Sequence, residues 1–466
     1  MVNNRNQYSR KPYPRRRKHS GRSVALAFTV VVLLFTAVIA FSPSFRDLLA
    51  SSLRSDVVET DAVKSTSDAD NITESSGDPE TTTTTAVPTT AVFEDIDIEL
   101  VGTGDVLLHM PVIEGVRRSV DGETVYQFEP VFKYVREIIE SADYSVFNFE
   151  GTLGGEPYSG YPMFSAPDDI IPALKTVGFD LGSTVNNHSI DRGMDGLLRT
   201  ISVFEKFEMP NIGTKSAAEN KSYRIEDING IKIGFSSYTY ETIGTEQNRA
   251  LNGITMSADL AQLVDSFNPY RDNIFQEDIQ EILLRVETMK KEGAEFICMV
   301  MHWGDEYHVS SNPYQQSMAQ KLADAGVDLV IGHHPHVVQE IDFVKSANSD
   351  HEMLIYYSLG NFISNQYYDT GGAAGKGQDG LMARINIRKT EDDVFITSAE
   401  YIPTHVVRVT ADGIASHRVV PVLDALESPA EFETTSDLMR TSLARTSAIM
   451  EANGSSDRIS LEAAGY

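Results

Sequence analysis

Six short clusters of polar residues in this sequence have the residue types that bind divalent metal ions or transfer protons. Their imidazole, carboxylate and amide groups are the donors that hold Zn, Mn or Fe in proteins. The densest cluster is Gly332-His333-His334-Pro335-His336, which holds three of the chain's eleven histidines. Each cluster follows a short apolar run, and ligands bind at strand ends in open α/β sheets. The pattern predicts a metal site assembled from several strand ends.

Two clusters have spacings that predict where their side chains point. Pro335 favours extended backbone at the residue before it, so we expect His334 and His336 to project in the same direction from an extended segment. In Asn148-Phe149-Glu150, strand alternation places Asn148 and Glu150 on one face and Phe149 on the other. These four polar side chains are therefore candidate ligands or neighbours of ligands.

A third cluster, at residues 186–193, places two amides, an imidazole and a carboxylate after one apolar run. His188 is a candidate general acid oriented by Asp191, because a carboxylate fixes the tautomer of the imidazole that it contacts. A turn in which Asp191 caps the following helix is the alternative.

The remaining clusters contain single candidates. His302 ends an apolar run and is expected to be a ligand, with Glu306 orienting it and Trp303, the chain's one tryptophan, walling the pocket or contacting substrate. Asp105 follows a strand and two glycines, which suits a metal ligand, although an ordinary turn is the alternative. His109 is expected to be a surface histidine.

Alternating apolar runs and helical patterns must position these clusters. Strands are predicted at 98–108, 144–149, 181–185, 231–236, 296–301, 329–331 and 354–358, and helices at 130–140, 169–177, 194–207, 272–291 and 313–325. This alternation predicts an α/β sheet with crossover helices. Residues 381–387 and 394–401 have no helix between them and are predicted to be antiparallel.

Two further segments are less regular. Residues 371–380, which contain Lys376 and five glycines, are predicted to be either a lid over the site or an idle loop. The C-terminal tail 423–466 is polar, with one helix predicted at 436–450, and is expected to be peripheral.

The N-terminal region predicts a membrane anchor. Residues 1–22 contain eight Lys or Arg and no acid, and residues 24–41 are apolar except for Thr29 and Thr36. Eighteen helical residues span roughly 27 Å, close to the hydrocarbon thickness of a bilayer. We expect a cytoplasmic arm (1–22), a transmembrane helix (23–42) and an extracellular body. A cleavable signal peptide is the alternative.

Composition bounds the rest of the chain. Residues 43–93 are rich in Ser, Thr and acidic residues and are predicted to be a disordered stalk. The whole chain has a formal net charge of −28 and the arm contributes +8, so the remaining residues have a net charge of −36. So acidic a body repels phosphate backbones, which argues against nucleic-acid binding. The one cysteine, Cys298, can form no internal disulfide and is expected to be buried.

Taken in chain order, the motifs resemble those of the CapA family, which is tied to poly-γ-glutamate capsule synthesis in bacteria. They are Gly-Asp at 104–105, Asn-x-Glu at 148–150, Asn-Asn-His-x-x-Asp at 186–191, His-Trp-Gly-x-Glu at 302–306, His-Pro-His at 334–336 and Ser-Leu-Gly-Asn-Phe at 358–362. The resemblance runs from about residue 98 to residue 405. It implies a calcineurin-like metallophosphoesterase-type fold, a layered α/β/β/α sandwich, for residues 94–422.

The resemblance also implies roles for individual residues. The metal ligands would be Asp105, Glu150, Asn187, His302, His334 and His336, with Glu150 bridging and His188 catalytic. Substrate-binding or supporting residues would be Asn148, Asn186, Trp303, Glu306, His333 and Asn361. Phosphoesterases of this type have Asp-x-His in their first motif, whereas His109 lies four residues after Asp105. Either one or two divalent ions (Mn, Zn or Fe) are therefore expected.

Three functions follow as hypotheses. The first is a metal-dependent hydrolase that acts on, or escorts, a poly-γ-glutamate-like anionic envelope polymer. The second is a phosphoesterase that cleaves phosphate esters in the envelope. The third is a non-catalytic subunit whose anchor helix docks onto a membrane-bound capsule synthase.

Overall fold

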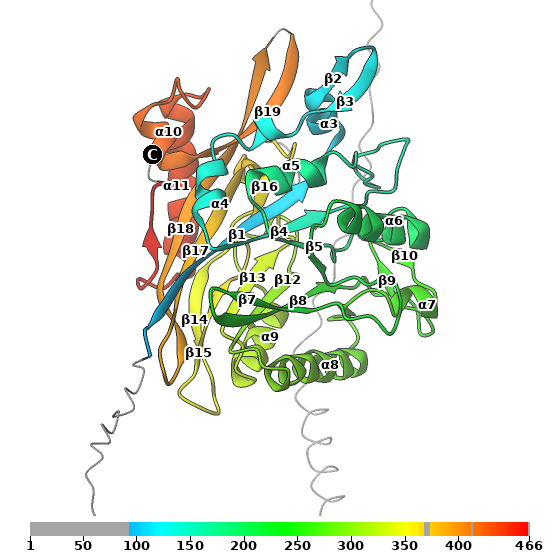
Figure 1. Ribbon diagram of the computed structural model, residues 1–466, viewed down its shortest axis with the longest axis vertical. Coiled ribbons are helices and arrows are strands. Elements are labelled where there is room, and N and C mark those ends of the chain that lie inside the picture. Colours follow the sequence, from blue (N-terminus) through cyan, green and yellow to red (C-terminus); the bar gives the residue numbers. More distant parts are fainter. Residues whose placement is uncertain (1–92, 368–372, 412, 465–466) are drawn as a thin grey trace, which may run out of the picture. The chain divides into compact units, whose positions relative to one another are not determined.

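Two β-sheets packed face to face form the centre of the protein in the computed structural model, which describes residues 93–367, 373–411 and 413–464 (Figure 1). The predicted arm, transmembrane helix and stalk lie outside the described residues, apart from Phe93. Within the described ranges, no helix combines the length and apolar character needed to cross a bilayer.

The first sheet joins a parallel half to an antiparallel half. Its strand order is β19 (Ile414–Pro421), β18 (Val394–Ala411), β17 (Asp379–Lys389), β1 (Ile96–Leu107), β4 (Tyr144–Glu150), β5 (Leu181–Ser183) and β6 (Asn211–Ile212). β1, β4, β5 and β6 run parallel, whereas β17, β18 and β19 are antiparallel. The short strands β16 (Asn361–Ile363) and β20 (Ser460–Leu461) pair with β1 and β18.

The second sheet is parallel at its centre. Its order is β11 (Ser266–Phe267), β8 (Ile231–Tyr240), β12 (Phe296–His302), β13 (Leu329–His333), β15 (Glu352–Tyr356) and β14 (Ile341–Lys345). β7 (Arg224–Ile228) pairs antiparallel with β8, and β14 pairs antiparallel with β15. The parallel strands β8, β12, β13 and β15 therefore all end at the same edge.

Helices cover the outer faces of both sheets (Figure 1). The longer ones are α5 (Ile170–Val177), α6 (Gly193–Lys206), α8 (Asp272–Lys291), α9 (Pro313–Asp324) and α11 (Ser436–Asn453). The shorter elements are α3 (Met110–Val116), β2 (Arg117–Val120), β3 (Glu123–Tyr126), η1 (Glu129–Val131), α4 (Arg136–Ser141), β9 (Ala250–Leu251), β10 (Ile254–Thr255), α7 (Ala258–Ala261), η3 (Lys376–Gln378) and α10 (Val422–Glu427).

Three apolar clusters show that the layers are helix, sheet, sheet, helix. One joins α5 and α6 to the first sheet through residues such as Leu174, Phe204 and Phe147. A second fills the space between the sheets, where the buried Cys298 also lies. A third joins α8 and α9 to the outer face of the second sheet. The predicted layered α/β arrangement and the buried cysteine are confirmed.

Gly102 of β1 faces the second sheet beside the strand end that carries Asp105. A Cβ placed on Gly102 would lie 2.8 Å from Cδ1 of Ile331 in the facing sheet. A larger residue at 102 would therefore require the Ile331 side chain to move.

Most predicted elements are present with shifted ends. The helices predicted at 169–177, 194–207, 272–291 and 313–325 correspond to α5, α6, α8 and α9, and the predicted pairing of β17 with β18 is antiparallel. The helix predicted at 130–140 is wrong, because that segment divides into η1 and α4.

The C-terminal tail is an integral part of the domain, so the expectation of a peripheral tail from residue 423 is wrong. α11 buries Met439 and Met450, and β20 adds to the first sheet beside β18. Its strongest attachment is polar. Asp379 at the start of β17 accepts hydrogen bonds from Ser442 at 2.6 Å and from Arg445 at 2.6 and 2.8 Å, and lies 2.8 Å from Nδ1 of His405.

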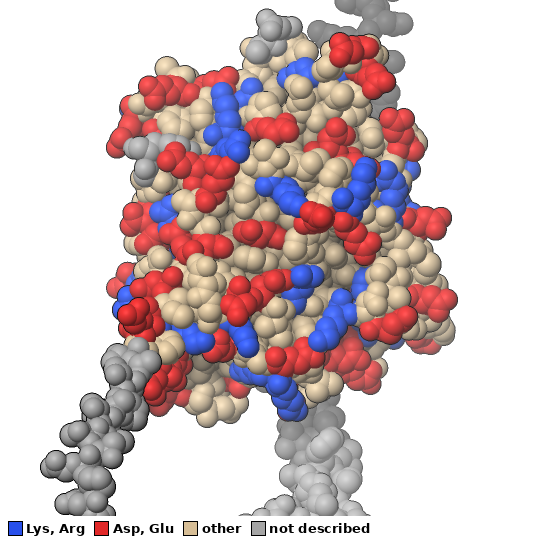
Figure 2. Space-filling view, in the orientation of Figure 1, with Lys and Arg blue, Asp and Glu red and all other residues tan. Residues whose placement is uncertain are grey.

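Acidic and basic side chains are interspersed on the face of the molecule shown in Figure 2, rather than gathered by sign. Several basic side chains are paired with carboxylates, as in Arg388 with Asp97 and Lys389 with Glu295. On that face, the surface offers no continuous basic track of the kind that binds a phosphate backbone.

Replacing Arg445 with Met should destabilise the protein by about 3 kcal/mol, because the buried Asp379 would lose its cationic partner. Arg440→Met is the matched control, since Arg440 lies on the same helix but pairs with Asp437 at the exposed surface. That control should cost less than about 1 kcal/mol. Urea unfolding at pH 7 measures both, and equal losses would contradict the role assigned to the Asp379 cluster.

Candidate metal centre

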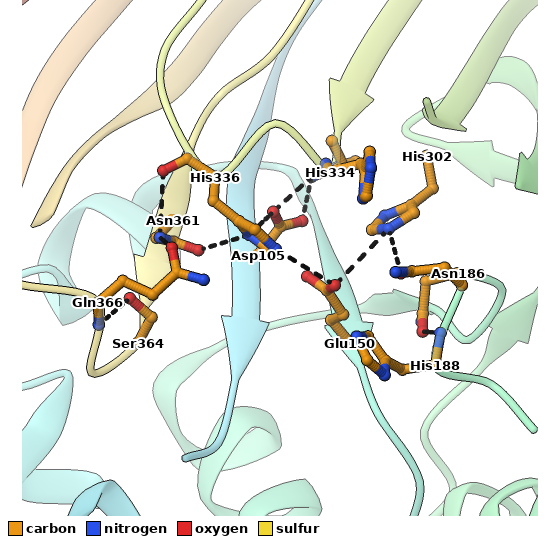
Figure 3. Close-up of polar contacts among 12 residues, drawn as sticks. Asp105, Glu150, Asn186, His188, His302, His334, His336, Asn361, Ser364 and Gln366 are labelled. Atoms are coloured by element: carbon orange, nitrogen blue, oxygen red, sulfur yellow. Dashed lines mark hydrogen bonds and ion pairs between the residues drawn. The ribbon is translucent and has the colours of Figure 1, made fainter. Parts of the chain in front are cut away.

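The ends of parallel strands from both sheets meet at one point. Asp105 comes from β1 and is paired in register with Asn148 of β4 and Asn361 of β16. In the second sheet, His302 at the end of β12 is paired with His333 at the end of β13. In Figure 3, the side chains of Asp105, Glu150, His302, His334 and His336 lie around a common centre.

Two groups of three side chains have the geometry to hold metal ions, and they share Glu150. Ligand atoms of Glu150, His302 and His334 lie within 4.8 Å of one another, as do those of Asp105, Glu150 and His336. Oδ1 of Asn187 lies 2.9 Å from Nε2 of His302, beside the first group. The structure therefore brings together all six residues predicted to be ligands, with Glu150 in the bridging position.

Unsatisfied polar atoms show that these residues fit a cation. Both carboxylate oxygens of Glu150, Nδ1 of His334 and Oδ1 of Asn148 are buried without a hydrogen-bond partner. Buried polar atoms are rarely left without partners, because the desolvation cost is high. Nitrogen and oxygen donors in this proportion suit Zn, Mn or Fe. One or two divalent ions would satisfy the atoms that the protein leaves unpaired.

The charges of the site also favour a cation. Burial raises the pKa of Glu150 well above its usual value, and the attraction of His336 does not offset this. Burial would lower the pKa of His336, but Glu150 and Asp105 raise it to about 9. A divalent ion among these groups would balance both carboxylates without a protonated imidazole.

The other two histidines are neutral, as metal binding requires. Burial and the neighbouring His334 lower the pKa of His302 well below its usual value. Burial and His336 do the same to the pKa of His334. Asp105 is held ionised, since His333 and His336, each 3.2 Å from one of its oxygens, lower its pKa well below the usual range despite burial.

Two amide side chains contact the candidate ligands and fix their orientation. The amide nitrogen of Asn148 donates to Asp105 at 2.8 Å and lies 3.3 Å from Nδ1 of His302. Oδ1 of Asn361 lies 3.1 Å from Nδ1 of His336, and its amide nitrogen donates to the carbonyl oxygens of His336 and Gly377 and to Gln366. Asn148 and Asn361 thus fix ligand side chains in both groups.

The conformation of the histidine cluster differs from the prediction of an extended segment. His334 has φ of 97° and His336 has φ of 57°, so both lie in the left-handed region. Non-glycine residues adopt this region at an energetic cost, and such strain gathers at functional sites. Both imidazoles reach the shared Glu150, but a turn directs them there. The predicted extended segment is wrong. His333 stays at the end of β13, against Asp105.

The predicted acid and its carboxylate form a second group beside the ligands. Nδ1 of His188 lies 2.8 Å from Asp191, and no described side chain bonds its Nε2. Asn186 holds the loop that carries His188, since its Oδ1 accepts from the His188 backbone and its amide donates to Phe149 O. Asp191 also accepts from the backbone nitrogen of Phe164 at 2.6 Å. His188 is therefore fixed in orientation with one nitrogen available.

Two supporting predictions are wrong, and one is revised. Trp303 is fully buried in the core between the second sheet and its helices, and its indole donates to Tyr357 O, so it contacts no substrate. Glu306 is exposed and does not orient His302, whose ring lies between Asn148 and Asn187. His109 is half-buried rather than on the surface, and it belongs to neither ligand group.

Several neighbours of the site were not predicted. Asn252 lies 3.2 Å from both Nδ1 of His188 and Oδ1 of Asp191, although it sits in an Asn-Gly turn that indicates only a hairpin. The Tyr240 ring lies 4.5 Å from that of His334. In the glycine-rich loop, residues 371 and 372 lie outside the described residues, and Lys376–Gln378 forms η3, with the Gly377 carbonyl bonded to Asn361.

The fold and the site together define a class: a two-sheet α/β protein with two buried groups of candidate metal ligands that share one carboxylate at its strand ends. The sequence also matches a known protein family. The model of the family described as bacterial capsule synthesis protein PGA_cap matches residues 99–366, which is more than half of the chain. This chain belongs to that family.

Curated relatives agree. The capsule biosynthesis protein CapA of Bacillus anthracis is 28% identical over 283 residues, covering 59% of this chain and 61% of that protein. The PGA biosynthesis protein CapA of Bacillus subtilis (strain 168) is 26% identical over 252 residues, covering 51% of this chain and 57% of that protein. The matches span about 60% of the length of these relatives.

Solved structures show a weak similarity only. The calcineurin-like phosphoesterase YfkN from Bacillus subtilis aligns over 76% of this chain and 97% of its own, with 14% identity and a TM-score of 0.34. Similarity at this level carries no argument about chemistry. The interpretation of the site depends on its own geometry.

Purified protein equilibrated with Mn or Zn should retain metal, and Glu150→Gln should lose most of it, because both ligand groups use Glu150. In EDTA, the same substitution should change the Tm much less than it does with metal bound, since burial already raises the pKa of the Glu150 carboxyl and so favours its neutral form. Elemental analysis and thermal unfolding measure the two effects. Glu306→Gln, on an exposed neighbour, is the control, and equal metal contents in all three proteins would disprove the site.

Asn148→Ala should weaken metal binding by about 10- to 100-fold, because the amide contacts both Asp105 and His302. Competition with a chelating indicator measures the affinity. Unchanged affinity would show that Asn148 does not position ligands.

Proposed function

We propose that this protein is a metal-dependent hydrolase of capsule synthesis that cleaves γ-glutamyl amide bonds in a poly-γ-glutamate-like polymer. The observation that carries the proposal is the pair of ligand groups sharing Glu150, with the oriented His188 beside them. A purely structural metal site would be closed by its ligands. Here a histidine with a free nitrogen, fixed by a carboxylate, lies next to the ligands, which is the arrangement of a site that transfers protons.

The protein's own residues supply positioning and proton transfer. Asp105, Glu150, His302, His334 and His336, with Asn187 beside them, would hold one or two divalent cations. When bound, such cations polarise a carbonyl or phosphoryl oxygen and make water a better nucleophile.

His188 would complete the reaction. Asp191 keeps the proton of the neutral imidazole on Nδ1, so Nε2 is the nitrogen that faces substrate. In its protonated state, His188 can give a proton from Nε2 to the departing amine. Asn252 and the Phe164 backbone hold Asp191 in place for this task.

Family membership and chemistry support the proposed substrate class. The relatives carry names of capsule and PGA biosynthesis. A polymer of glutamate is anionic, and a body with a net charge of −36 would repel it except where cations are concentrated. The metal centre would provide that concentration of positive charge. We therefore place the polymer at the metal centre.

The N-terminal sequence supports a membrane-anchored protein whose described domain lies outside the cell. In this proposal, residues 23–42 anchor the chain as a single transmembrane helix with the N-terminus in the cytoplasm, and the described domain is extracellular. Such an anchor could also contact membrane-bound capsule synthase subunits. Nucleic acid is not among the proposed partners.

Hydrolysis of γ-glutamyl oligomers and of phosphate esters, each with and without Mn or Zn, tests the proposal. We expect metal-dependent cleavage of the γ-glutamyl bond, and His188→Ala should lower it by roughly 10²- to 10⁴-fold while metal content is retained. His308→Ala, on an exposed histidine, is the control.

Each alternative gives a different result. Cleavage confined to phosphate esters would identify an envelope phosphoesterase. No cleavage of either substrate by the metal-loaded protein would point to a non-catalytic subunit, and exchange of residues 23–42 for an unrelated anchor should then abolish polymer export.

A further inference from the structure

A pocket of about 570 Å³ opens beside the His188–Asp191 pair. One wall is the loop 157–163, and the other side is formed by Met110, Asp191 and Arg192. The pocket is separate from the ligand groups but shares Asp191 with the proton-transfer pair. A substrate cleaved at the metal centre would release its departing half on the side of His188, which is the side where this pocket lies.

The wall of the pocket is attached to the proton-transfer pair. Ser159 and Ser165 exchange backbone hydrogen bonds of 3.0 and 2.9 Å, which close the loop into a hairpin. Immediately before Ser165, the Phe164 backbone donates to Asp191, and the Phe164 ring contacts the His188 ring edge-on at 4.7 Å. Movement of the loop would therefore disturb His188. The loop and the acid form one unit.

Arg192 is the positively charged residue in this pocket that can bind an anionic ligand. Asp191 and Arg192 are the only charged residues that line it, and Asp191 is engaged by His188, Phe164 and Asn252. Arg192 bonds the carbonyl oxygen of Pro157, its Nε is buried without a partner, and none of the described carboxylates forms an ion pair with it. A guanidinium without an acidic partner, in so acidic a chain, is suited to an anionic ligand.

Two glycines leave room for the stem of Arg192. A Cβ on Gly154 would collide with the Cβ and Cγ atoms of Arg192, and a Cβ on Gly196 would collide with its Cβ atom. Gly154 lies in the loop that follows β4, and Gly196 lies in the first turn of α6. The stem is thereby confined on two sides, so the placement of the guanidinium is built into the fold.

Aromatic and apolar side chains continue the pocket toward the metal centre. Tyr161 is 77% exposed and Met163 is 38% exposed, and both line this pocket, so they give it an apolar rim. The Tyr307 ring is 6.1 Å from that of His336. A bound chain could extend from the ligands past Tyr307 and Tyr161 into the pocket.

We propose that this pocket receives the leaving half of a γ-glutamyl amide and that Arg192 pairs with its α-carboxylate. In a γ-linked polymer, the amide nitrogen is bonded to the α-carbon that carries the free carboxylate. An anion therefore lies two bonds from the nitrogen that departs. Arg192 lines the same pocket as Asp191, and Asp191 holds His188, so Arg192 can contact that anion while His188 faces the nitrogen.

The chemical step balances. Water adds its oxygen to the γ-carbonyl carbon, the bond from that carbon to nitrogen breaks, and the nitrogen takes a proton from protonated His188. Of the two protons of the water, one replaces the proton that His188 gave and the other converts the departing amine to an ammonium. The products are a γ-carboxylate and an ammonium whose α-carboxylate is paired with Arg192. This assignment rests on the proposed hydrolase function. It adds that Arg192, by binding the α-carboxylate, makes the site select γ-linked glutamate over other amides.

The test compares two probes that differ by one group: γ-glutamylglutamate and γ-glutamyl-4-aminobutyrate, which lacks only the α-carboxylate. Calorimetric titration of the metal-loaded full chain should show roughly tenfold tighter binding of the first probe, as expected for a charge-assisted pair. Arg192→Gln should bring the two dissociation constants to within about twofold, and Arg192→Lys should keep part of the preference. Arg136→Gln, which makes the same charge change at an exposed position on α4, should keep all of it.

The outcomes separate this inference from the proposed function. A preference that persists in Arg192→Gln, or binding of neither probe to the wild-type protein, would overturn the assignment of Arg192. A preference that depends on Arg192 without any cleavage would support the pocket and reject the hydrolase. Cleavage without a preference would do the reverse. Metal content and Tm identify any variant that fails to fold.

Discussion

The structure depends on a balance of charge at Glu150. This carboxylate is 1% exposed, and neither of its oxygens has a hydrogen-bond partner. An uncompensated charge at such a position costs several kcal/mol, so Glu150 must either take up a proton, as its raised pKa favours, or have positive charge beside it. His336 supplies part of it, and a divalent cation would supply the rest. The two sheets, the tight turn that carries His334 and His336, and the supporting amides all serve to gather nitrogen and oxygen donors around this one group.

Part of the site could be predicted because parallel strands end at a common edge. That rule accounts for the neighbouring positions of Asp105 and Glu150 in the first sheet, and strand alternation predicted that Asn148 and Glu150 share a face. It does not account for the meeting of these residues with His302, which comes from the second sheet. The full ligand set and the layered sandwich were expected from the family resemblance, whereas alternation of strands and helices predicted only an α/β sheet.

What could not be predicted depended on local backbone or on contacts distant in the chain. Periodicity contains no signal for the left-handed conformations of His334 and His336, so an extended segment was expected. Asn252 reaches the His188 pair through a hairpin turn more than sixty residues away, and Asn-Gly indicates only that turn. The C-terminal tail appeared polar because part of its attachment is an ion cluster around Asp379, which adds to the few apolar side chains that α11 buries. Glu306 and Trp303 were assigned by proximity in sequence, which does not determine direction.

The strained turn at residues 334–336 has a consequence for the order of events in folding. A chain that has not yet assembled its sheets has no reason to hold two histidines at positive φ, since each costs about 1 kcal/mol or more. The five strand ends that contribute donors are separated by up to 231 residues, so their encounter also requires the closure of long loops. Neither an isolated segment nor a half-formed sheet would contain the site. Capture of the ion would be a late event, which stabilises a domain that has already reached its native arrangement instead of guiding it there.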